Sequence, residues 1–559
     1  MKKIIIILMC ILSFSSCSDD ILDIPAKDRI ADDIVWTDLS LIKAYHNELY
    51  NCIQHGFKIH MQSKATDEAY NSISWDIGII PVGSLTADNV TVVENTHWTG
   101  GGNLYYWNTA YQYIRKINVF LEKMQGDVQI ENKDRLIAEA KFLRAYINFM
   151  LIHRHGGVPI IDEVFGMVDD IEFKRNTFDE CVQFIEKDLS EAITDLPQKY
   201  EATDANFGRA TQDACKALRS RMLLYAASPL FNTTNDRQKW QKAADAAKEL
   251  LESGYALHAD YSKLFNQVSG TANSEIIFAR TFSTTNFHQA PMHNLGRRYG
   301  AYGGWWASNG PSQNLVDDYD MSNGEPPFFD TNGEKTINPA SGYDPQNPYA
   351  DRDPRFYHTV IYDGSVYHGD LHEMWVSTDG KTWGYDSEKQ SSDNPRTCYI
   401  LRKFMPEEGV ELSWQENYTN PWILFRLGEI YLNYAEASFE LGDEATCREY
   451  ISKIRERVGM PPIPNSVTGE ELRKRLYNER RIELAFEEHR FWDLRRWKLA
   501  MDVENRPIYG MRIIKDIDTE VKTYEPYLLL ERLFLEHMYL LPIATDEVRK
   551  TSLSQNPGY

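Results

Sequence analysis

A pair of amphipathic helical segments at residues 426–459 constrains the fold of this chain more than any other feature. The first segment, RLGEIYLNYAEASFEL, spaces its apolar residues along one face of a helix. Gly442 interrupts the pattern, and Asp443 can cap the second helix, EATCREYISKIRERV. The unit has roughly the length of a tetratricopeptide repeat. Because such a pair cannot bury its apolar faces alone, it predicts a scaffold of stacked helix pairs.

Three further segments carry the same helical period. Residues 137–155 and 210–227 each place apolar and small residues on one face, and a half-unit, KWQKAADAAKELLESGY, follows at residues 239–255. Gly156 and Pro229 are expected to end the first two helices. The chain is therefore predicted to be mainly α, built on a tetratricopeptide-like helix-pair scaffold.

Two long stretches depart from this pattern. Residues 60–110 and 282–420 are rich in Gly, Asn, Asp, Pro, Ser and aromatic residues and show little helical period. Loops of this length in a compact protein are usually functional or disordered. Their many Trp and Tyr residues argue against disorder. We expect a loop-rich half with short strands, carried on the helical scaffold.

The start of the chain has the pattern of an export signal. Lys2 and Lys3 precede a short apolar run, which is too short to cross a bilayer as a helix. The segment LSFSSC, ending at Cys17, resembles a bacterial lipoprotein processing box. Residues 1–16 would then be a signal peptide, and Cys17 would become the mature N-terminus and carry lipid. Several acyl chains would anchor the protein stably.

Composition narrows the function further. The chain has 60 Lys and Arg against 82 Asp and Glu, a formal net charge of −22, which argues against binding to nucleic acid. No zinc-like Cys/His spacing is present, and we expect no disulfide framework. The cysteines that would remain after processing and lipidation are Cys52, Cys181, Cys215, Cys398 and Cys447.

Two polar motifs do not indicate a metal site. HGDLHE, at residues 368–373, has neither the order nor the unbroken helix that a zinc protease motif requires. DYDMSNGEP, at residues 318–326, lacks the full calcium-loop pattern and is interpreted as an Asp/Gly turn. No cofactor is predicted; a structural Ca²⁺ is possible but not indicated.

A series of motifs, taken in order, resembles the SusD/RagB family, the nutrient-binding outer-membrane lipoproteins of Bacteroidota. Its pieces are AEAKFLRAYINFMLIHRHGGVPII (138–161), GRATQDACKALRSRMLLYAASPLFN (208–232), FRLGEIYLNYAEA (425–437), IRERVGMP (454–461), ERRIELAFEEHRFWDLRRW (479–497) and SQNPGY (554–559).

The resemblance implies four tetratricopeptide-like helix pairs and a loop-rich ligand-binding half. It divides the chain into an N-terminal region, 17–232, and a C-terminal region, 233–559, in one compact body. It implies a non-catalytic protein of the outer membrane that binds oligosaccharides. The acidic Asp19 and Asp20 just after Cys17 resemble signals for export to the cell surface. The implied partner is a TonB-dependent barrel of the SusC type.

Chemistry points to two glycine-flanked aromatic segments as the binding site. An exposed aromatic face can stack on a sugar ring while neighbouring polar side chains bind its hydroxyls. NTHWTGGGNLYYW (95–107) and RRYGAYGGWWASNG (297–310) fit, and in the family ligand contacts come from loops in these two parts of the chain. We predict Trp98, Trp305 and Trp306 as platforms, with one of the adjacent pair turned inward. Lesser candidates are Tyr299, Asn89, Asp67, Glu68 and Trp75.

The motif ERRIELAFEEHRFWDLRRW is predicted to be structural. Arg480–Glu483 and Glu487–Arg490 place opposite charges three residues apart, as pairs on one helix face would be. Trp492, in the same motif, and Trp497, at its end, are expected to be packing anchors.

Three other functions remain open. A peptide-binding member of the same family would need an extended cleft with backbone hydrogen-bond partners. A surface glycosidase would need two carboxyl groups about 5 to 9 Å apart beside the aromatic loops, and turnover. A purely structural tetratricopeptide protein would not need the two aromatic loops.

Overall fold

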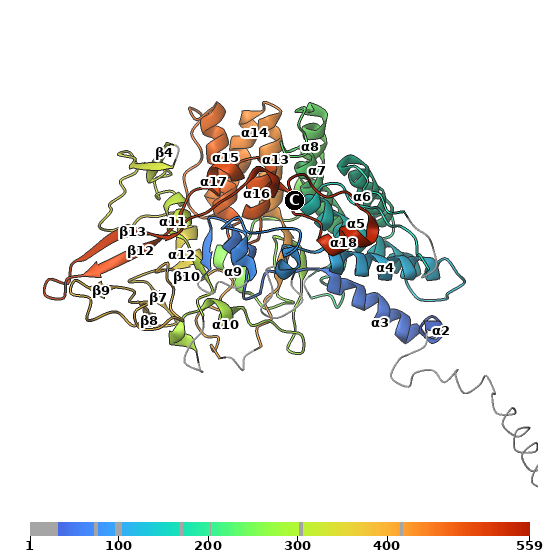
Figure 1. Ribbon diagram of the computed structural model, residues 1–559, viewed down its shortest axis with the longest axis horizontal. Coiled ribbons are helices and arrows are strands. Elements are labelled where there is room, and N and C mark those ends of the chain that lie inside the picture. Colours follow the sequence, from blue (N-terminus) through green and yellow to red (C-terminus); the bar gives the residue numbers. More distant parts are fainter. Residues whose placement is uncertain are drawn as a thin grey trace, which may run out of the picture.

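A computed structural model shows an array of long helices on one side of the molecule and a loop-rich half on the other (Figure 1). The long helices are α3 (Leu39–Leu49), α4 (Trp107–Met124), α5 (Lys133–His155), α6 (Phe178–Ile193), α7 (Gln212–Ala227), α8 (Arg237–Leu251), α13 (Leu427–Glu440), α14 (Glu444–Arg457) and α15 (Gly469–Glu483). The residues that the structure describes are 32–71, 76–94, 103–166, 172–201, 203–300, 306–331, 333–413 and 417–559.

Neighbouring helices of the array pack in chain order from α4 to α8. Helix α8 then packs against α13, which is paired with α14 and α15. The chain therefore leaves the array after α8, forms the loop-rich half, and returns to the array at α13. The predicted helix-pair scaffold is confirmed. Within the described residues, no helix is both long and apolar enough to pass through a bilayer.

Local signals fix the ends of these helices. Asp443 caps α14, because its side chain accepts a hydrogen bond of 3.0 Å from the backbone N–H of Thr446. Gly156 follows α5 with a positive φ of 75°, a conformation that suits a residue without a Cβ atom. Thr211 caps α7, and Pro229 comes just beyond its end. The predicted helix pair at residues 426–459 is therefore observed as α13 and α14.

The loop-rich half contains short strands and short helices. Strands β2 and β11 form an antiparallel ladder that contacts α7 of the array. Strands β12 and β13 form a long hairpin at the far side of the molecule (Figure 1). The strands are β1 (Ala69–Asn71), β2 (Ile276–Arg280), β3 (Asn309–Pro311), β4 (Phe328–Thr331), β5 (Glu334–Ile337), β6 (Val360–Ile361), β7 (Val366–Tyr367), β8 (Asp370–Leu371), β9 (Val376–Ser377), β10 (Ile400–Leu401), β11 (Trp422–Arg426), β12 (Ile508–Lys515) and β13 (Lys522–Leu530). The short helices are α2 (Asp32–Val35), α9 (Tyr261–Asn266), α10 (Ala290–Asn294), α11 (Gln313–Asp318), α12 (Pro354–Thr359), α16 (Arg490–Arg496), α17 (Ala500–Val503) and α18 (Thr545–Thr551).

The segment DYDMSNGEP forms a turn after α11, as predicted. The backbone N–H of Gly324 donates to the carbonyl of Met321 at 2.8 Å, and Gly324 has a φ of 87°. Asp320 in this turn pairs with Arg455 of α14 at 3.0 Å. The cysteines predicted to stay unpaired, Cys52, Cys181, Cys215, Cys398 and Cys447, are all buried and free.

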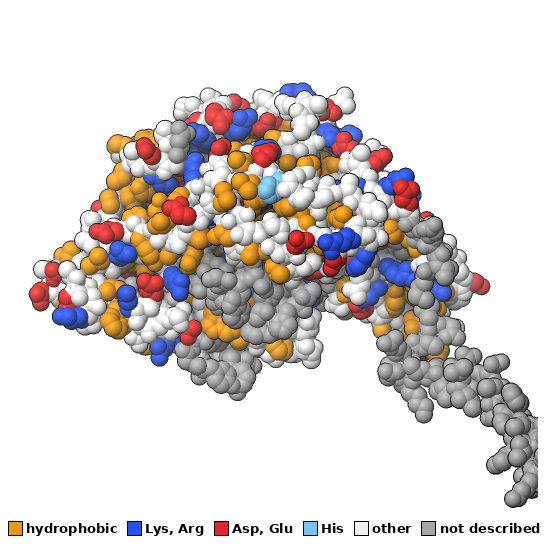
Figure 2. All heavy atoms as spheres, in the orientation of Figure 1, with side chains coloured by type: hydrophobic (Ala, Val, Ile, Leu, Met, Phe, Trp, Pro, Cys, Tyr) orange, Lys and Arg blue, Asp and Glu red, His pale blue; other side chains and the backbone are white. Residues whose placement is uncertain are grey.

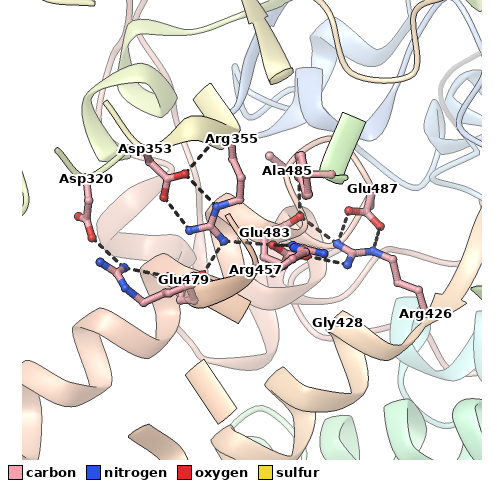
Figure 3. Close-up of polar contacts among 12 residues, drawn as sticks. Asp320, Asp353, Arg355, Arg426, Gly428, Arg457, Glu479, Glu483, Ala485 and Glu487 are labelled. Atoms are coloured by element: carbon pink, nitrogen blue, oxygen red, sulfur yellow. Dashed lines mark hydrogen bonds and ion pairs between the residues drawn. The ribbon is translucent and has the colours of Figure 1, made fainter. Parts of the chain in front are cut away.

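A buried ionic network joins the two halves (Figure 3). Glu483, at the end of α15, accepts hydrogen bonds from Arg355 of α12, Arg426 of β11 and Arg457 of α14, with N···O distances of 2.6 to 3.0 Å. Arg355 also pairs with Asp353 at 2.7 Å, in the loop-rich half. Burial would raise the pKa of Glu483, but the three guanidinium groups outweigh it and hold that pKa well below its usual range.

The predicted local ion pairs of this motif are wrong. Helix α15 ends at Glu483, so Glu487 and Arg490 do not share a helix face. Arg480 pairs instead with Asp493 at 2.8 Å. Glu487 pairs with Arg426 and Lys403, and Arg490 pairs with Asp67.

The predicted packing role of the two tryptophans is confirmed. Trp492 and Trp497 are both buried. Trp492 donates its indole N–H to Gln62 at 2.8 Å, and Trp497 donates to Glu436 of α13 at 2.7 Å. The motif therefore joins distant segments rather than stabilising one helix.

Candidate functional site

A short ladder brings two distant parts of the loop-rich half together. Strand β1 pairs antiparallel with β3, with Ala69 opposite Pro311 and Asn71 opposite Asn309. Gly310 lies at the centre of the ladder, where a Cβ atom would be 2.8 Å from the hydroxyl of Thr397. A larger residue would press against Thr397 and the carbonyl of Tyr399, so β3 or the segment at 397–399 would have to shift. The segment that ends at β1 and the segment that leads into β3 therefore form one surface.

Buried polar contacts hold β3 in place from below. Lys64 donates from Nζ to the hydroxyl of Ser308 at 2.5 Å and to the carbonyl of Ile59 at 2.9 Å. The amide of Asn309 accepts a hydrogen bond from the backbone N–H of Met61 at 3.1 Å. Burial holds the pKa of Lys64 well below its usual range. These buried hydrogen bonds therefore fix the position of the segment that begins at residue 306.

Trp306 lies at the start of this segment and is half-buried. Its ring stacks on the imidazole of His293 in α10, with centroids 5.9 Å apart and planes 22° apart. Burial lowers the pKa of His293 to about 4, so this imidazole is neutral at pH 7. Trp306 thus has one face supported by a neutral ring. Such a supported aromatic is suited to stacking on a flat ligand.

Tyr299 lies in the short turn of 3₁₀-helix Arg297–Tyr299 and is also half-buried. Its hydroxyl donates to the carbonyl of Tyr367 at 2.9 Å, and the Nε2 atom of His372 lies 2.9 Å from the same hydroxyl. The ring meets that of Tyr367 edge to face, with centroids 5.5 Å apart. Burial raises the pKa of Tyr299, so the phenol is neutral. These contacts fix the orientation of the ring.

A second layer holds the partners of Tyr299. Arg298 binds Asp386 with both ends of its guanidinium, at 3.0 and 2.7 Å. His372 is buried, and its Nδ1 atom lies 3.5 Å from Asp386. Burial would raise the pKa of Asp386, but His372 and Arg298 lower it to about 2. HGDLHE thus contributes a support for Tyr299. Among the described residues, no group of three or more His, Cys, Asp or Glu could hold a metal.

The two predicted acidic candidates are buried beside β1. Asp67 accepts two hydrogen bonds from Arg490, both at 2.9 Å, and its carboxylate is 3.0 Å from Arg481. Glu68 is 1% exposed, and burial raises its pKa to about 8. The structure therefore places both side chains beneath the surface. A direct contact with ligand stays a prediction for each.

Asn89 closes a local turn. Its amide accepts a hydrogen bond from the backbone N–H of Thr86 at 2.8 Å and donates to the carbonyl of Ser84 at 2.9 Å. Both ends of the amide thus have partners within the loop. Four other predicted residues lie outside the described residues: Cys17, Trp75, Trp98 and Trp305.

Sequence reasoning missed the residues that support the aromatic side chains. No predicted site includes His293 or Asp386, and the sequence suggests for His372 only the metal-ligand role that HGDLHE does not support. No signal in the sequence links His372 to Tyr299, because the contact arises from tertiary folding. The described residues therefore include a supported indole at Trp306 and a fixed phenol at Tyr299, on one stretch of the chain.

Comparisons with known proteins cover almost the whole chain. Residues 274–559 match a family model described as "SusD family". Residues 33–224 match one described as "Starch-binding associating with outer membrane". The protein named "Starch-binding protein SusD" of Bacteroides thetaiotaomicron is 26% identical over 504 residues, 83% of this chain and 79% of that protein.

Solved structures agree with these matches. A SusD-like protein from Bacteroides fragilis superposes with a TM-score of 0.77 at 29% identity, covering 95% of this chain and 99% of that one. A SusD-like carbohydrate binding protein from the same species superposes with a TM-score of 0.73 at 25% identity, covering 92% of this chain and 98% of that one.

Proposed function

The chain belongs to the SusD family, and from this premise we propose that it is a non-catalytic, cell-surface glycan-binding lipoprotein. It would capture oligosaccharides outside the cell and deliver them to a TonB-dependent, SusC-like barrel of the outer membrane. The relatives support this proposal, because one is named as starch-binding and another as carbohydrate binding. Lipid on Cys17 would anchor the protein at the outer membrane, facing outward.

One structural observation carries the proposal. Beside β3, the ring of Trp306 stacks on the imidazole of His293. The buried hydrogen bond from Lys64 to Ser308 fixes the chain that follows Trp306. An aromatic ring that is held rigidly gives a flat apolar surface without paying the entropy of ordering a mobile side chain on binding. Tyr299 lies near the end of α10, on the same stretch of chain, and its hydroxyl is oriented by hydrogen bonds. Trp98, Trp305 and Trp75 are proposed as further contacts.

Capture and release need only modest affinity. Single aromatic and hydroxyl contacts bind weakly, and a long glycan that spans several of them gains affinity from its length. No bond needs to break. For such a protein we expect measurable glycan binding and no new reducing ends, because the glycan is not hydrolysed.

The experiment is a glycan-array screen of residues 18–559, followed by calorimetry on any polysaccharide that binds. We expect binding to one polysaccharide class, and we expect Trp306→Ala to weaken it at least about 10-fold, the loss of one stacking contact of roughly 1.5 kcal/mol. A double Trp98→Ala and Trp305→Ala variant is tested alongside.

The matched control is Trp36→Ala. Trp36 is also half-buried and packs on Tyr45 at 5.0 Å, but it lies beside α3 in the helical half. Its loss should leave glycan affinity unchanged. Binding that survives every variant of Trp98, Trp305 and Trp306 would contradict the site. Binding of peptides alone would favour the peptide-binding class, and release of reducing ends would favour a glycosidase.

A further inference from the structure

A cleft of about 730 Å³ lies between two hairpins of the loop-rich half. One wall is the β4–β5 hairpin, and the other is the β12–β13 hairpin with the chain that follows α17. Figure 2 shows hydrophobic, basic and acidic side chains together on this side of the molecule. The volume lies within the roughly 300–1,000 Å³ typical of small-molecule sites. Neither Trp306 nor Tyr299 lines this cleft, but Asp67, a candidate residue of the first site, does.

Aromatic side chains line both walls. Phe328 and Tyr343 meet edge to face on one wall, with ring centroids 4.8 Å apart. Tyr509 and Tyr524 line the opposite wall, and Tyr509 is 37% exposed. A ring-shaped ligand between these walls would find an aromatic face on either side. This arrangement suits a sugar ring, whose C–H face is apolar and whose edge carries hydroxyl groups.

Three arginines gather at one part of the cleft, although its lining as a whole has as many acidic as basic side chains. Arg481, Arg490 and Arg532 line it together with Asp67. Arg490 and Arg481 share Asp67, as described above. Among these three arginines, Arg532 alone has no described carboxylate within 4.0 Å.

Arg532 is nine-tenths buried, being 7% exposed. Its Nε atom donates to the carbonyl of Arg506 at 2.7 Å, and its Nη2 atom donates to that of Val503 at 2.6 Å. Among the described residues, the Nη1 atom has no hydrogen-bond partner. Asp67 and Glu504 act on this guanidinium electrostatically, but neither carboxylate lies within 4.0 Å of it. An orphaned buried donor is destabilising, and an anionic ligand would supply the missing acceptor.

The other basic groups at the cleft already have acidic partners. Lys335 pairs with Asp317 at 2.9 Å. Arg506 pairs with Asp330 at 2.7 Å, and this contact joins the two walls. Both members of that pair are about one third exposed, so it lies nearer the solvent than Arg532. An acidic ligand that enters the cleft is therefore attracted most strongly to the unpaired guanidinium.

We propose that this cleft binds a sugar that carries an acidic group, a carboxylate or a sulfate. The acidic group pairs with Arg532, and the sugar ring lies between Tyr343 and Tyr524. The site is separate from the one under "Proposed function", so an acidic glycan chain can be held at two places on the same molecule. Its binding does not require Trp306.

The test is calorimetry of residues 18–559 with a galacturonic acid oligosaccharide, a sulfated galactan oligosaccharide and the neutral galactan oligosaccharide. We expect at least one acidic ligand to bind more tightly than the neutral one, and to weaken as salt is added. Arg532→Gln should lower that affinity roughly 10- to 100-fold, the value of one charge-assisted hydrogen bond. The two acidic ligands distinguish a carboxylate from a sulfate.

Matched variants separate this site from the first. Arg512→Gln removes an exposed arginine of β12 that does not line the cleft, and it should leave the affinity unchanged. Trp306→Ala should also leave it unchanged. Because Arg532 holds two backbone carbonyls, thermal unfolding is recorded for each variant, and Tyr343→Ala provides a second test at the wall.

Four results would overturn the proposal. The first is equal binding of acidic and neutral oligosaccharides, or binding of none. The second is an effect of Arg512→Gln as large as those of Arg532→Gln and Tyr343→Ala. The third comes from a glutamate-rich peptide titrated in the same way: its binding in place of the acidic sugars would assign the cleft to peptides. Loss of acidic-sugar binding in Trp306→Ala, with the cleft variants intact, would place the ligand at the first site.

Discussion

Replacing Glu483 by Gln tests how the helical and loop-rich halves are held together. The variant keeps the shape of the side chain and removes one negative charge from the middle of the buried network (Figure 3). The side chain is 0% exposed, so water cannot compensate for the lost charge. Three guanidinium groups would then face a neutral amide, whose NH₂ end can only donate hydrogen bonds.

The magnitude follows from what each arginine retains. Breaking a buried ion pair costs about 3–5 kcal/mol. Arg426 keeps Glu275 and Glu487, both at 2.7 Å, and Arg355 keeps Asp353 at 2.7 Å. These remaining carboxylates limit the imbalance. We therefore expect Glu483→Gln to lower the free energy of unfolding by about 3 kcal/mol, at the lower end of that range.

Urea denaturation of residues 18–559 at pH 7 measures the loss. The control is Glu449→Gln in α14, whose partner is Lys453 at 2.7 Å and whose side chain is 57% exposed. Its free energy of unfolding should change by less than about 0.5 kcal/mol. A loss in Glu483→Gln no greater than in this control would refute the reasoning.

The pH dependence gives a second check. The pKa of Glu483 is lower in the folded protein than in the unfolded chain. Its contribution to stability is therefore present above the unfolded pKa and is lost as the pH falls through the folded pKa. The difference in the free energy of unfolding between wild type and Glu483→Gln should narrow as the pH falls below about 4. A difference that widens there would contradict this assignment.

Three further changes test the account at other positions. Burial raises the pKa of Glu68 to about 8, so its ionisation destabilises the fold as the pH rises from about 4.5 towards 8. Glu68→Gln should flatten the decline in thermal stability over that range, and an unchanged slope would contradict it. Gly310→Ala places a Cβ atom 2.8 Å from the hydroxyl of Thr397, so urea denaturation should show a loss of about 1–3 kcal/mol, and glycan affinity should fall with it. Asp443→Ala removes the cap on Thr446 and should cost about 1 kcal/mol in the same assay, whereas no loss would show that the cap is not needed.

The helical scaffold could be predicted because its signals are local. The apolar period of residues 426–441, the glycine at 442 and the cap at Asp443 all act within a few residues, and α13 and α14 appear where these signals place them. The ion pairs of the motif that follows could not be predicted in this way. Glu483 binds arginines that lie 26, 57 and 128 residues away in the chain. Phe486, with a φ of 61°, lies in the turn that separates α15 from α16 and breaks the expected local spacing.

The candidate site could be predicted in part. The glycine-flanked segment at residues 297–310 does present Trp306 and Tyr299, half-buried and held by neighbours. The neighbours themselves, among them His293 and His372, come from other segments, and only the folded chain brings them together. The cleft between the two hairpins could not be predicted from the sequence, because the hairpins that form its walls are far apart in the chain.

A crystal structure of residues 18–559 with the oligosaccharide found by the glycan screen would test the central claim most directly. The account predicts a sugar ring in van der Waals contact with the indole ring of Trp306, with intact glycosidic bonds. Sugar bound only at a distance from β1 and β3, or a cleaved product at the aromatic surface, would contradict it.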